Sequence, residues 1–344
     1  MLQAKAPRVT IQDVAALSGL SICTVSRALR NLPNVSASAQ GKVSDAAAKL
    51  GYKASPAASR LAGGTTGSIA IIAPTATAWF FAQAVEAAEE VFAGAGYDTV
   101  LISLRNRPSV HSKLFGDLAG LSQRVDGILL LNIALSEAEL AAVDASGLAV
   151  ASVGMHDVPW DNVGIDNVEA ARAATEHLLD LGHWDVAMLS GSETGEPSLV
   201  TANDRLRGFE QALAAHHVAV DPDLVLEAGS SIEGGRLAMI ELIENRRMPS
   251  AILAGCDETA FGALMALRDH GLSAPKNMSI IGIDDHQMSW FLGLSTIAQP
   301  VADQGAFAAN LLIDRLHRSG LPNPPSGHVL ETKLIARKST RRRR

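Results

Sequence analysis

The 344-residue sequence predicts an α/β protein in which a small helical head precedes a larger body of parallel β-sheets. Beyond residue 68, short unbroken apolar runs alternate with helical stretches, a pattern typical of strands that helices cover on both faces. The head differs in charge, because residues 1–61 hold eight Lys or Arg but only two acidic residues, whereas the whole chain carries a net charge of −7. The apolar runs are SIAIIAP, TVLIS, GILLLN, AVASVG, DVAMLSG, AILAGC and SIIGID.

The head begins with a short helix and a tight turn. Thr10 and Asp13 form a capping pattern, and the apolar residues that follow recur at helical spacing, which predicts a helix over residues 11–17. Gly19 suits the positive backbone dihedral of a turn, and the hydroxyl group of Ser21 can cap the next helix.

The second helix presents a basic face to solvent. Val25 and Leu29 lie four residues apart and share the buried face, which turns Arg27 outward. A third helix is expected over residues 37–50, between a serine cap and a terminal glycine. Two helices joined by a short glycine turn form a helix-turn-helix, whose second helix enters the major groove of DNA. The alternative is a helical bundle that only caps the body and carries a solvated charged face.

The stretch VTIQDVAALSGLSICTVSRALRN resembles the head of the lactose-repressor (LacI-type) family of bacterial regulators, and its TVSRAL core is specific. Ile22 and Cys23 fall where the first base-reading side chains of that family lie. Apolar contacts with thymine methyl groups and an Arg27 contact with guanine are therefore expected to dominate readout. Leu20 stands where the family usually has Val. The DNA-binding residues that the resemblance implies in the head are Thr10, Ser21, Ile22, Cys23, Thr24, Ser26, Arg27 and Asn34.

The segment SPAASRLAGGTTG, residues 55–67, predicts a very short helix followed by a flexible link. So short a helix is marginal in isolation. The matching segment of the family is a hinge helix that orders on operator DNA and inserts a leucine into the minor groove, and Leu61 occupies that position here. Ser-Pro replaces the more common Pro-Asn pair at its start.

The body resembles the two-lobed periplasmic-binding-protein architecture that this family joins to its head. Ligands of open α/β sheets bind at the carboxyl ends of the strands, which this architecture places in the cleft between the lobes. The implied domains are a DNA-binding domain (1–54), a hinge and linker (55–67), an effector-binding and dimerisation domain (68–340) and a basic tail (341–344). Lobe one is expected at about 68–166 and 300–325, and lobe two at about 167–296 and 327–339.

Three stretches at strand ends carry the expected effector contacts. Arg205 in RLRG matches the arginine of the R-L-x-G motif of the family, which donates to effector oxygens. Asp284 in GIDD matches the carboxylate that accepts from effector hydroxyl groups or amines. The rings of WFF are suited to stack on a sugar face. The full set of expected effector residues is Trp79, Phe80, Phe81, Asp166, Arg205, Cys256, Asp257 and Asp284.

Each candidate has a simpler structural alternative. The alternative for Arg205 is a surface ion pair, for Asp284 and Asp166 a helix cap, and for the aromatic residues of WFF, Phe81 above all, an ordinary place in the core. Cys256 stands where the family often has Asn, and because a thiol is a poor hydrogen-bond partner, the effector chemistry of relatives does not transfer directly. A sugar or related polyol is the expected effector, and a purine is the alternative.

The sequence lacks the phosphate loop, nucleophile elbow, metalloprotease motif and dinucleotide fingerprint of common enzymes, so no catalytic residue, cofactor or metal is expected. The rival hypotheses are a solute-binding protein, which needs a signal peptide, and a sugar- or nucleotide-modifying enzyme, which needs a nucleophile or metal cluster. No apolar run approaches the length of about 18 residues that spans a membrane, so a cytoplasmic protein is expected.

The assembly expected from the sequence is a homodimer that binds a palindromic operator in double-stranded DNA. No leucine heptads follow Lys338, so the coiled coil that makes some relatives tetramers is not expected. The final arginine run is expected to be a disordered, solvated tail, and added non-specific attraction to DNA is the alternative. Both cysteines, Cys23 and Cys256, are expected to be reduced packing residues.

Overall fold

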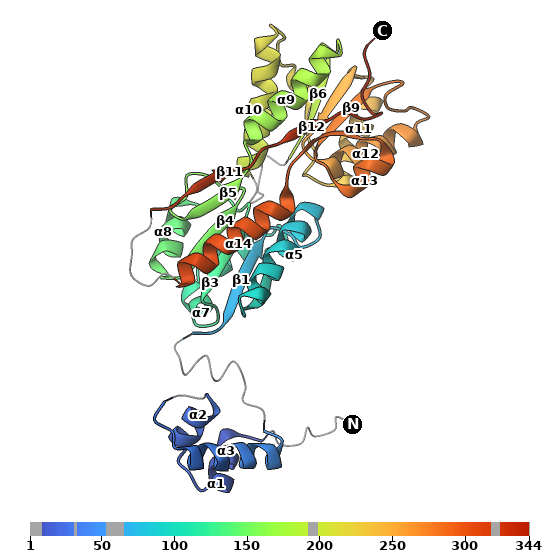
Figure 1. Ribbon diagram of the computed structural model, residues 1–344. Coiled ribbons are helices and arrows are strands. Elements are labelled where there is room, and N and C mark those ends of the chain that lie inside the picture. The colour runs from blue at the N-terminus through green and yellow to red at the C-terminus, as the bar shows by residue number, and fades with distance from the viewer. Residues whose placement is uncertain (1–8, 31–32, 53–64, 192–198, 318–323, 344) are drawn as a thin grey trace. The chain divides into compact units, whose positions relative to one another are not determined.

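The computed structural model describes residues 9–30, 33–52, 65–191, 199–317 and 324–343 (Figure 1). The chain divides into two compact units, the head (Met1–Gly67) and the body (Ser68–Arg344). The hinge helix that the sequence predicts, including Leu61, lies outside the described residues.

The head holds the three expected helices, α1 (Ile11–Ser18), α2 (Ile22–Leu29) and α3 (Ala37–Leu50). Gly19 ends α1 at a φ of 68°, the left-handed conformation that the turn into α2 requires. Leu29 is only half-buried, and Ala28 takes the deeper position beside it. The predicted three-helix arrangement is therefore confirmed. Its small core consists of Val14, Ala15, Val25, Ala28, Val43, Ala46 and Ala47.

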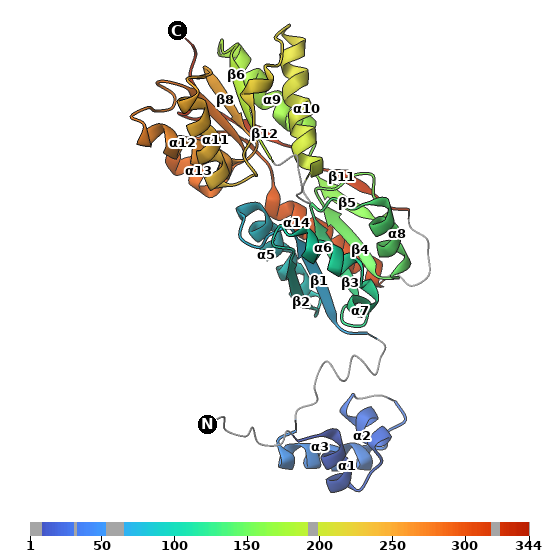
Figure 2. The same ribbon diagram turned by 180° about the vertical axis from the view of Figure 1, so that it is seen from behind.

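Among the described residues, the body forms two six-stranded sheets, one in each lobe (Figures 1 and 2). The sheet of lobe one is parallel throughout, and the sheet of lobe two is parallel except where β12 pairs with β10. Lobe one has the order β11 (Gly327–Val329), β5 (Asp161–Gly164), β4 (Ala149–Val153), β3 (Gly127–Leu131), β1 (Ser68–Ala73) and β2 (Asp98–Ser103). Lobe two has the order β12 (Lys333–Ile335), β10 (Ser295–Ala298), β9 (Ser279–Asp284), β8 (Ala251–Ala254), β6 (Val186–Ser190) and β7 (Val225–Glu227).

Helices cover both faces of each sheet, which explains why the central strands are apolar without alternation. In β1, Ile69 and Ile71 pack on one face beside α5 and α14, whereas Ala70 and Ile72 pack on the other face with residues of α6, α7 and α8. The helices of lobe one are α5 (Trp79–Gly94), α6 (Pro108–Phe115), α7 (Leu118–Ser122), α8 (Glu137–Ala145) and α14 (Val301–His317). Those of lobe two are α9 (Asn167–Asp180), α10 (Leu199–Ala215), the 3₁₀ turn η1 (Pro222–Leu224), α11 (Ile232–Glu244), α12 (Asp257–Asp269) and α13 (Gln287–Leu292).

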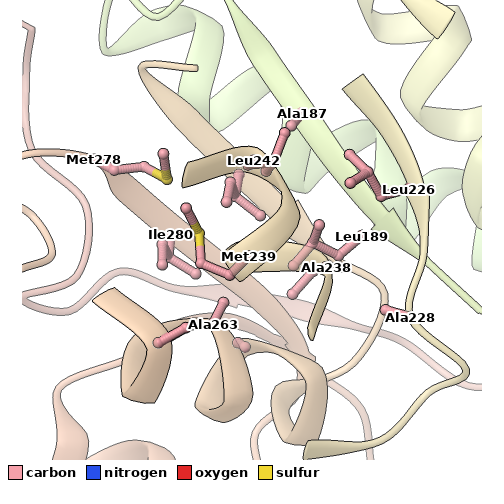
Figure 3. Close-up of a cluster of buried hydrophobic side chains, with 14 of the residues drawn as sticks. Ala187, Leu189, Leu226, Ala228, Ala238, Met239, Leu242, Ala263, Met278 and Ile280 are labelled. Carbon is pink, nitrogen blue, oxygen red and sulfur yellow. The ribbon is translucent and has the colours of Figure 1, made fainter. Parts of the chain in front are cut away.

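The core of lobe two is divided by its sheet in the same way. On one face, Met239 and Leu242 of α11 pack with Ala263 of α12 against Leu189 and Ile280 (Figure 3). The opposite face packs against α9 and α10. Burial of apolar side chains on both faces stabilises the fold by about 25 cal/mol per Å² of apolar surface. The sheet is therefore held firmly in place, and with it the strand ends that carry the polar residues described below.

The chain passes between the lobes after β5, after β10 and after β11, and the last crossing differs from the sequence prediction. Residues 327–329 were expected in lobe two. They form β11, which pairs in parallel with β5 of lobe one, and Asp161 holds this edge by accepting hydrogen bonds from Ser326 and Arg315. Lobe two regains the chain only at β12.

The C-terminal segment is anchored on lobe two, which corrects the expected disordered tail for residues 341–343. The backbone N–H of Arg341 donates to Ser279 Oγ at 3.1 Å, and that of Arg343 donates to the carbonyl of Leu181 at 2.8 Å. The buried hydroxyl group of Ser339 also donates to the carbonyl of Ile280. The exposed arginine residues 341–343 therefore belong to a segment whose backbone is hydrogen-bonded to lobe two.

Gly208 allows α10 to cross α9 at close range. A Cβ atom at this position would lie 2.1 Å from the carbonyl oxygen of Val168, a distance that side chains do not adopt. Because Arg205 lies one turn earlier on α10, the same crossing sets the position of its guanidinium group. The close packing of α9 against α10 therefore explains why the RLRG stretch has a glycine at position 208.

Replacing Gly208 by Ala should destabilise the body by about 1 to 3 kcal/mol, since the added methyl group forces the two helices apart. Urea unfolding followed by circular dichroism measures the loss. The matched control is Gly94→Ala in α5, where a Cβ atom meets nothing within 4 Å and alanine favours the helix. Equal unfolding midpoints for the two variants would contradict the packing reason given for Gly208.

Candidate functional site

A pocket lies between the lobes at the carboxyl ends of the strands, and we call it the cleft pocket. Lobe one contributes the segment before and at the start of α5 and the ends of β3 and β4. Lobe two contributes the ends of β6, β8 and β9 and one face of α10. Its polar and aromatic lining residues are Phe80, Phe81, Asn132, Asn167, Thr201, Arg205, Ser230, Cys256, Glu258, Asp284, Gln299 and Gln304.

Arg205 is a buried cation in the cleft pocket, with an exposed fraction of 9%. Its Nε donates to Asn167 Oδ1 at 2.9 Å, and its Nη1 donates to the carbonyl of Gly255. These bonds fix the plane of the guanidinium group and set its orientation toward the pocket. Arg205 therefore lines the pocket and does not form the surface ion pair of its structural alternative, whereas its contact with an effector stays a prediction.

Asp284 ends β9 and lines the same pocket, with an exposed fraction of 6%. Its Oδ1 accepts from Gln299 Nε2 at 2.6 Å, and Gln304 Nε2 in turn donates to Gln299 Oε1 at 3.0 Å. Burial raises the pKa of Asp284 to about 7, and the nearby charge of Asp257 adds to this rise, whereas Arg205 opposes it. The carboxyl group is thus poised to meet a hydrogen-bond donor from a ligand.

The backbone at Asp284 has a φ of 137°, a conformation that residues with side chains rarely adopt. Asp257 supports this turn from behind rather than from the pocket. It is fully buried and accepts from Ser289 Oγ at 2.6 Å, Thr296 Oγ1 at 2.7 Å and the backbone N–H of His286 at 2.9 Å. The structure therefore places Asp257 among residues that position the site.

The other expected effector residues divide between the pocket and its surroundings. Phe80 and Phe81 line the pocket and meet edge to face, with ring centroids 5.3 Å apart. Trp79 does not line it; its ring lies 4.8 Å from that of His286 in lobe two. Asp166 is exposed and caps α9 by accepting from Glu169 N at 2.9 Å, as its structural alternative predicts.

Cys256 lines the pocket as a neutral thiol. Its Sγ lies 3.2 Å from Thr259 Oγ1, and burial raises the pKa of the thiol to about 12. A protonated thiol is a weak hydrogen-bond donor and a weak acceptor. Cys256 is therefore suited to contact a ligand by van der Waals packing rather than by hydrogen bonds.

Within the described part of the chain, side-chain hydrogen bonds cross from lobe to lobe at several points. Thr201 Oγ1 donates to Asn132 Oδ1 at 2.8 Å, and His156 Nε2 lies 3.2 Å from Asp204 Oδ2. A further one joins Glu258 of α12 to α5. Sequence reasoning did not single out these residues, because polar side chains in a loop or on a helix carry no sign of a partner more than 45 positions away.

The head presents α2 as its exposed basic helix. Ile22 has an exposed fraction of 48%, and Cys23 is also exposed, so the expectation that Cys23 is a packing residue is wrong. Ser21 caps α2 by accepting from Thr24 N at 3.1 Å. Arg27 Nη2 donates to the carbonyl of Pro33 at 2.6 Å, so in the free head this guanidinium group is held against its own backbone.

The remaining DNA-binding candidates of the head have mixed placements. Thr10 is exposed, and its side chain serves the capping box of α1 with Asp13. Ser26 is half-buried, and Asn34 is exposed with a φ of 67°. Such a left-handed conformation is tolerated by Asn and turns the chain from α2 towards α3.

An exposed helix-turn-helix on the same chain as a two-lobed body with a charged cleft pocket defines a ligand-binding transcription regulator. The sequence model of the lacI family of bacterial regulatory proteins matches residues 10–55, and that of the periplasmic binding protein-like domain matches residues 175–340. The chain belongs to the lacI family, which consists of DNA-binding transcription regulators rather than enzymes.

Curated relatives and solved structures agree with this assignment along nearly the whole chain. The HTH-type transcriptional regulator DegA of Bacillus subtilis is 31% identical over 97% of this chain and 98% of its own. The complex of the transcriptional regulator CelR with cellobiose is 29% identical with a TM-score of 0.70, and covers 97% of this chain and 100% of its own. The lac repressor dimer bound to operator and the anti-inducer ONPF is 26% identical with a TM-score of 0.80 and the same coverage.

In the described part of the chain, no group of three or more His, Cys, Asp or Glu side chains is arranged to hold a metal ion. Among the same residues, no helix has both the length and the apolar character needed to cross a membrane.

The raised pKa of Asp284 predicts a pH dependence of stability. Its folded pKa of about 7 exceeds its ordinary value of 3.8, so the stability from this group is present below about pH 4 and lost as pH rises through 7. Asp284→Asn removes this dependence, so its unfolding free energy should fall less between pH 5 and pH 8 than that of the wild type, by about 2 kcal/mol. Urea unfolding at both pH values measures it.

Asp144→Asn on the exposed face of α8 is the matched control and should follow the wild type. A wild-type protein and an Asp284→Asn variant that lose the same stability between the two pH values would show that Asp284 is charged in the folded state at both.

Proposed function

We propose that this regulator is a repressor that binds a palindromic operator as a homodimer and is controlled by a small metabolite in the cleft pocket. The observation that carries the proposal is that Arg205 and Asp284, both more than nine-tenths buried, line one pocket between the lobes. Buried charges with remaining hydrogen-bonding capacity are costly unless a ligand or partner meets them. The exposed α2 supplies the DNA-binding half of the function.

A sugar is the effector that the pocket chemistry favours. Arg205 offers donors, Asp284 offers acceptors, and Phe80 and Phe81 offer aromatic faces, which together suit a ring rich in hydroxyl groups. The CelR structure was solved with cellobiose, which supports the same class. A purine is the second candidate, because its flat face and polar edge would use the same side chains.

The homodimer is supported by an exposed apolar surface on lobe two, which we call the α13 patch: Met288, Trp290, Phe291 and Leu292. Trp290 and Phe291 have exposed fractions of 74% and 76%. Two large exposed aromatic side chains on one short helix are typical of a protein interface. We assign a second copy of this chain as the partner, because a palindromic site requires a two-fold axis and the lac repressor structure is a dimer on its operator.

Replacing Arg27 by Ala should weaken operator binding by about 1 to 3 kcal/mol and relax the preference at one base pair in each half-site. A binding-site selection experiment measures the preference, and Lys49→Ala at the end of α3 is the control, expected to weaken binding to all sequences alike. Unchanged selectivity in Arg27→Ala would remove this residue from base readout.

Arg205→Ala and Asp284→Ala should each abolish the thermal shift that effector gives the wild type. That shift corresponds to about 2.7 kcal/mol at 100 times the dissociation constant. Operator binding without effector should be unchanged, because both residues belong to the body. Thermal-shift screening and fluorescence anisotropy of labelled operator measure the two properties. If both variants kept a normal effector response, the cleft pocket would not be the sensor.

Changing Trp290 and Phe291 together to Asp should turn the dimer into a monomer, because two carboxylates would be buried at the interface. Sedimentation velocity at micromolar concentration reports the state. Trp184→Asp is the matched control, since Trp184 is 52% exposed elsewhere on lobe two and the variant should remain dimeric. A monomeric wild type, or a dimeric double variant, would refute the α13 patch as the interface.

A further inference from the structure

Glu258 belongs to lobe two but makes its hydrogen bond with lobe one. It is the second residue of α12, and its Oε2 accepts from the backbone N–H of Trp79 at 3.3 Å. Trp79 is the first residue of α5, 179 positions away. The Glu258 side chain is half-buried and also lines the cleft pocket. One carboxylate therefore touches both the opposite lobe and the space for the effector.

Helix α5 lacks a side-chain cap of its own. Its N-cap residue is Ala78, whose side chain has no hydrogen-bond acceptor, so the first N–H groups of the helix depend on other partners. Two other helices that begin at the cleft, α9 and α11, are capped by their own Asp166 and Ser231. A carboxylate near a helix N-terminus is further favoured by the helix dipole.

A ring contact accompanies this hydrogen bond. The indole ring of Trp79 lies 4.8 Å from the imidazole ring of His286, which in turn meets Phe261 edge to face at 5.1 Å. His286 and Phe261 both belong to lobe two, so the start of α5 is held on the opposite lobe by a polar and an aromatic contact together. Both contacts exist only while the lobes are close.

We propose that Glu258 is a latch between the lobes and a specificity residue for the effector. It supplies, from lobe two, the helix cap that α5 of lobe one lacks, so the cap forms only in the closed cleft. Its carboxylate faces the pocket, so an effector that offers a hydroxyl or amino donor there is favoured, and one that places a phosphate or carboxylate there is repelled. The effector half of this inference rests on the proposed function, whereas the latch does not.

The latch can be tested without effector by a pair of substitutions at Trp79. Trp79→Ala removes the ring contact and keeps the N–H, whereas Trp79→Pro removes both. Proline suits the first position of a helix, and Ala78, at φ −72° and ψ 138°, already has the extended conformation that a residue before proline adopts. The difference between the two variants isolates the hydrogen bond to Glu258.

The readout is the distance between the lobes, measured on the full chain by electron spin resonance between labels at Glu89→Cys in α5 and Glu244→Cys in α11. Both sites are exposed. Cys23 is replaced by Ser, and Cys256 is buried with a thiol pKa of about 12, so it stays unlabelled. Circular dichroism confirms that each variant is folded.

Trp79→Pro should shift the ratio of closed to open cleft about fivefold further towards open than Trp79→Ala does. Glu258→Ala should open the cleft in the wild-type background and add nothing in the Trp79→Pro background. Glu241→Ala on the exposed face of α11 is the control and should leave the distances unchanged. Identical distances in Trp79→Pro and Trp79→Ala, or an equal effect of Glu258→Ala in both backgrounds, would overturn the latch.

The effector half uses matched neutral and phosphorylated sugars as probes: glucose with glucose 6-phosphate, and ribose with ribose 5-phosphate. Thermal shifts should favour the neutral member of a pair, and Glu258→Gln should reduce that preference about tenfold. A phosphorylated sugar that binds the wild type as tightly as its neutral partner would overturn the specificity role. Binding of none of the four would count against the sugar effector of the proposed function while the latch measurement stands.

Discussion

The cleft depends on one constraint, the parallel direction of the strands in each lobe. When neighbouring strands are parallel, every strand ends at the same edge of the sheet, and each connection to the following helix lies there. The ends of β3 and β4 in lobe one and of β6, β8 and β9 in lobe two thus face one space. Asn132 and Asp284, which are far apart in sequence, become two walls of one pocket.

The electrostatics of the pocket follow from the burial of two charged side chains, Arg205 and Asp284, beside neutral hydrogen-bond partners. Arg205 is held by two neutral oxygens, from Asn167 and Gly255, and Asp284 by one amide, from Gln299. Neutral partners orient a charge without cancelling it, and the low dielectric of the cleft strengthens its attraction for a ligand. The raised pKa of Asp284 is the energetic mark of this arrangement, because a fully paired carboxylate would titrate lower.

Contacts that cross from lobe to lobe hold the two sides of the cleft together. The hydrogen bond between Thr201 and Asn132 lies at the pocket, and Trp79 reaches Glu258 and His286 from the start of α5. Each contact is modest, and hydrogen bonds of this kind contribute about 1 kcal/mol net. A ligand with a differential affinity of a few kcal/mol is therefore sufficient to shift the lobes.

The sequence predicted the parts of the fold whose signal is local and continuous. All seven unbroken apolar runs became strands, and the capping pattern at Thr10 starts α1 as expected. The five strands β5, β7, β10, β11 and β12 were not among the predicted runs, because each is only three or four residues long and so short a stretch shows no clear periodicity. The prediction of a disordered tail at residues 341–343 was wrong for a similar reason, because the hydrogen bonds that hold this segment come from backbone groups that any sequence possesses.

The candidate site was predicted to the extent that a motif marks it. Arg205 and Asp284 lie in recognisable stretches at strand ends and line the pocket, as do Phe80, Phe81 and Cys256. Asp257 shares a strand end with Cys256, yet the first turn of α12 directs it into the core. Nothing local distinguishes Glu258 from a solvated helix residue, because its partner lies on the other lobe.

The most direct test of the proposed regulator is a thermodynamic cycle between its two ligands. Operator affinity is measured with and without saturating effector, and effector affinity with and without saturating operator, in the same buffer and at the same salt concentration. If the cleft controls DNA binding, the two ratios must be equal and differ from one, by about 5- to 150-fold. Two ratios of one would show that the effector pocket and the DNA-binding head act independently, and would contradict the assignment of this chain as an effector-controlled repressor.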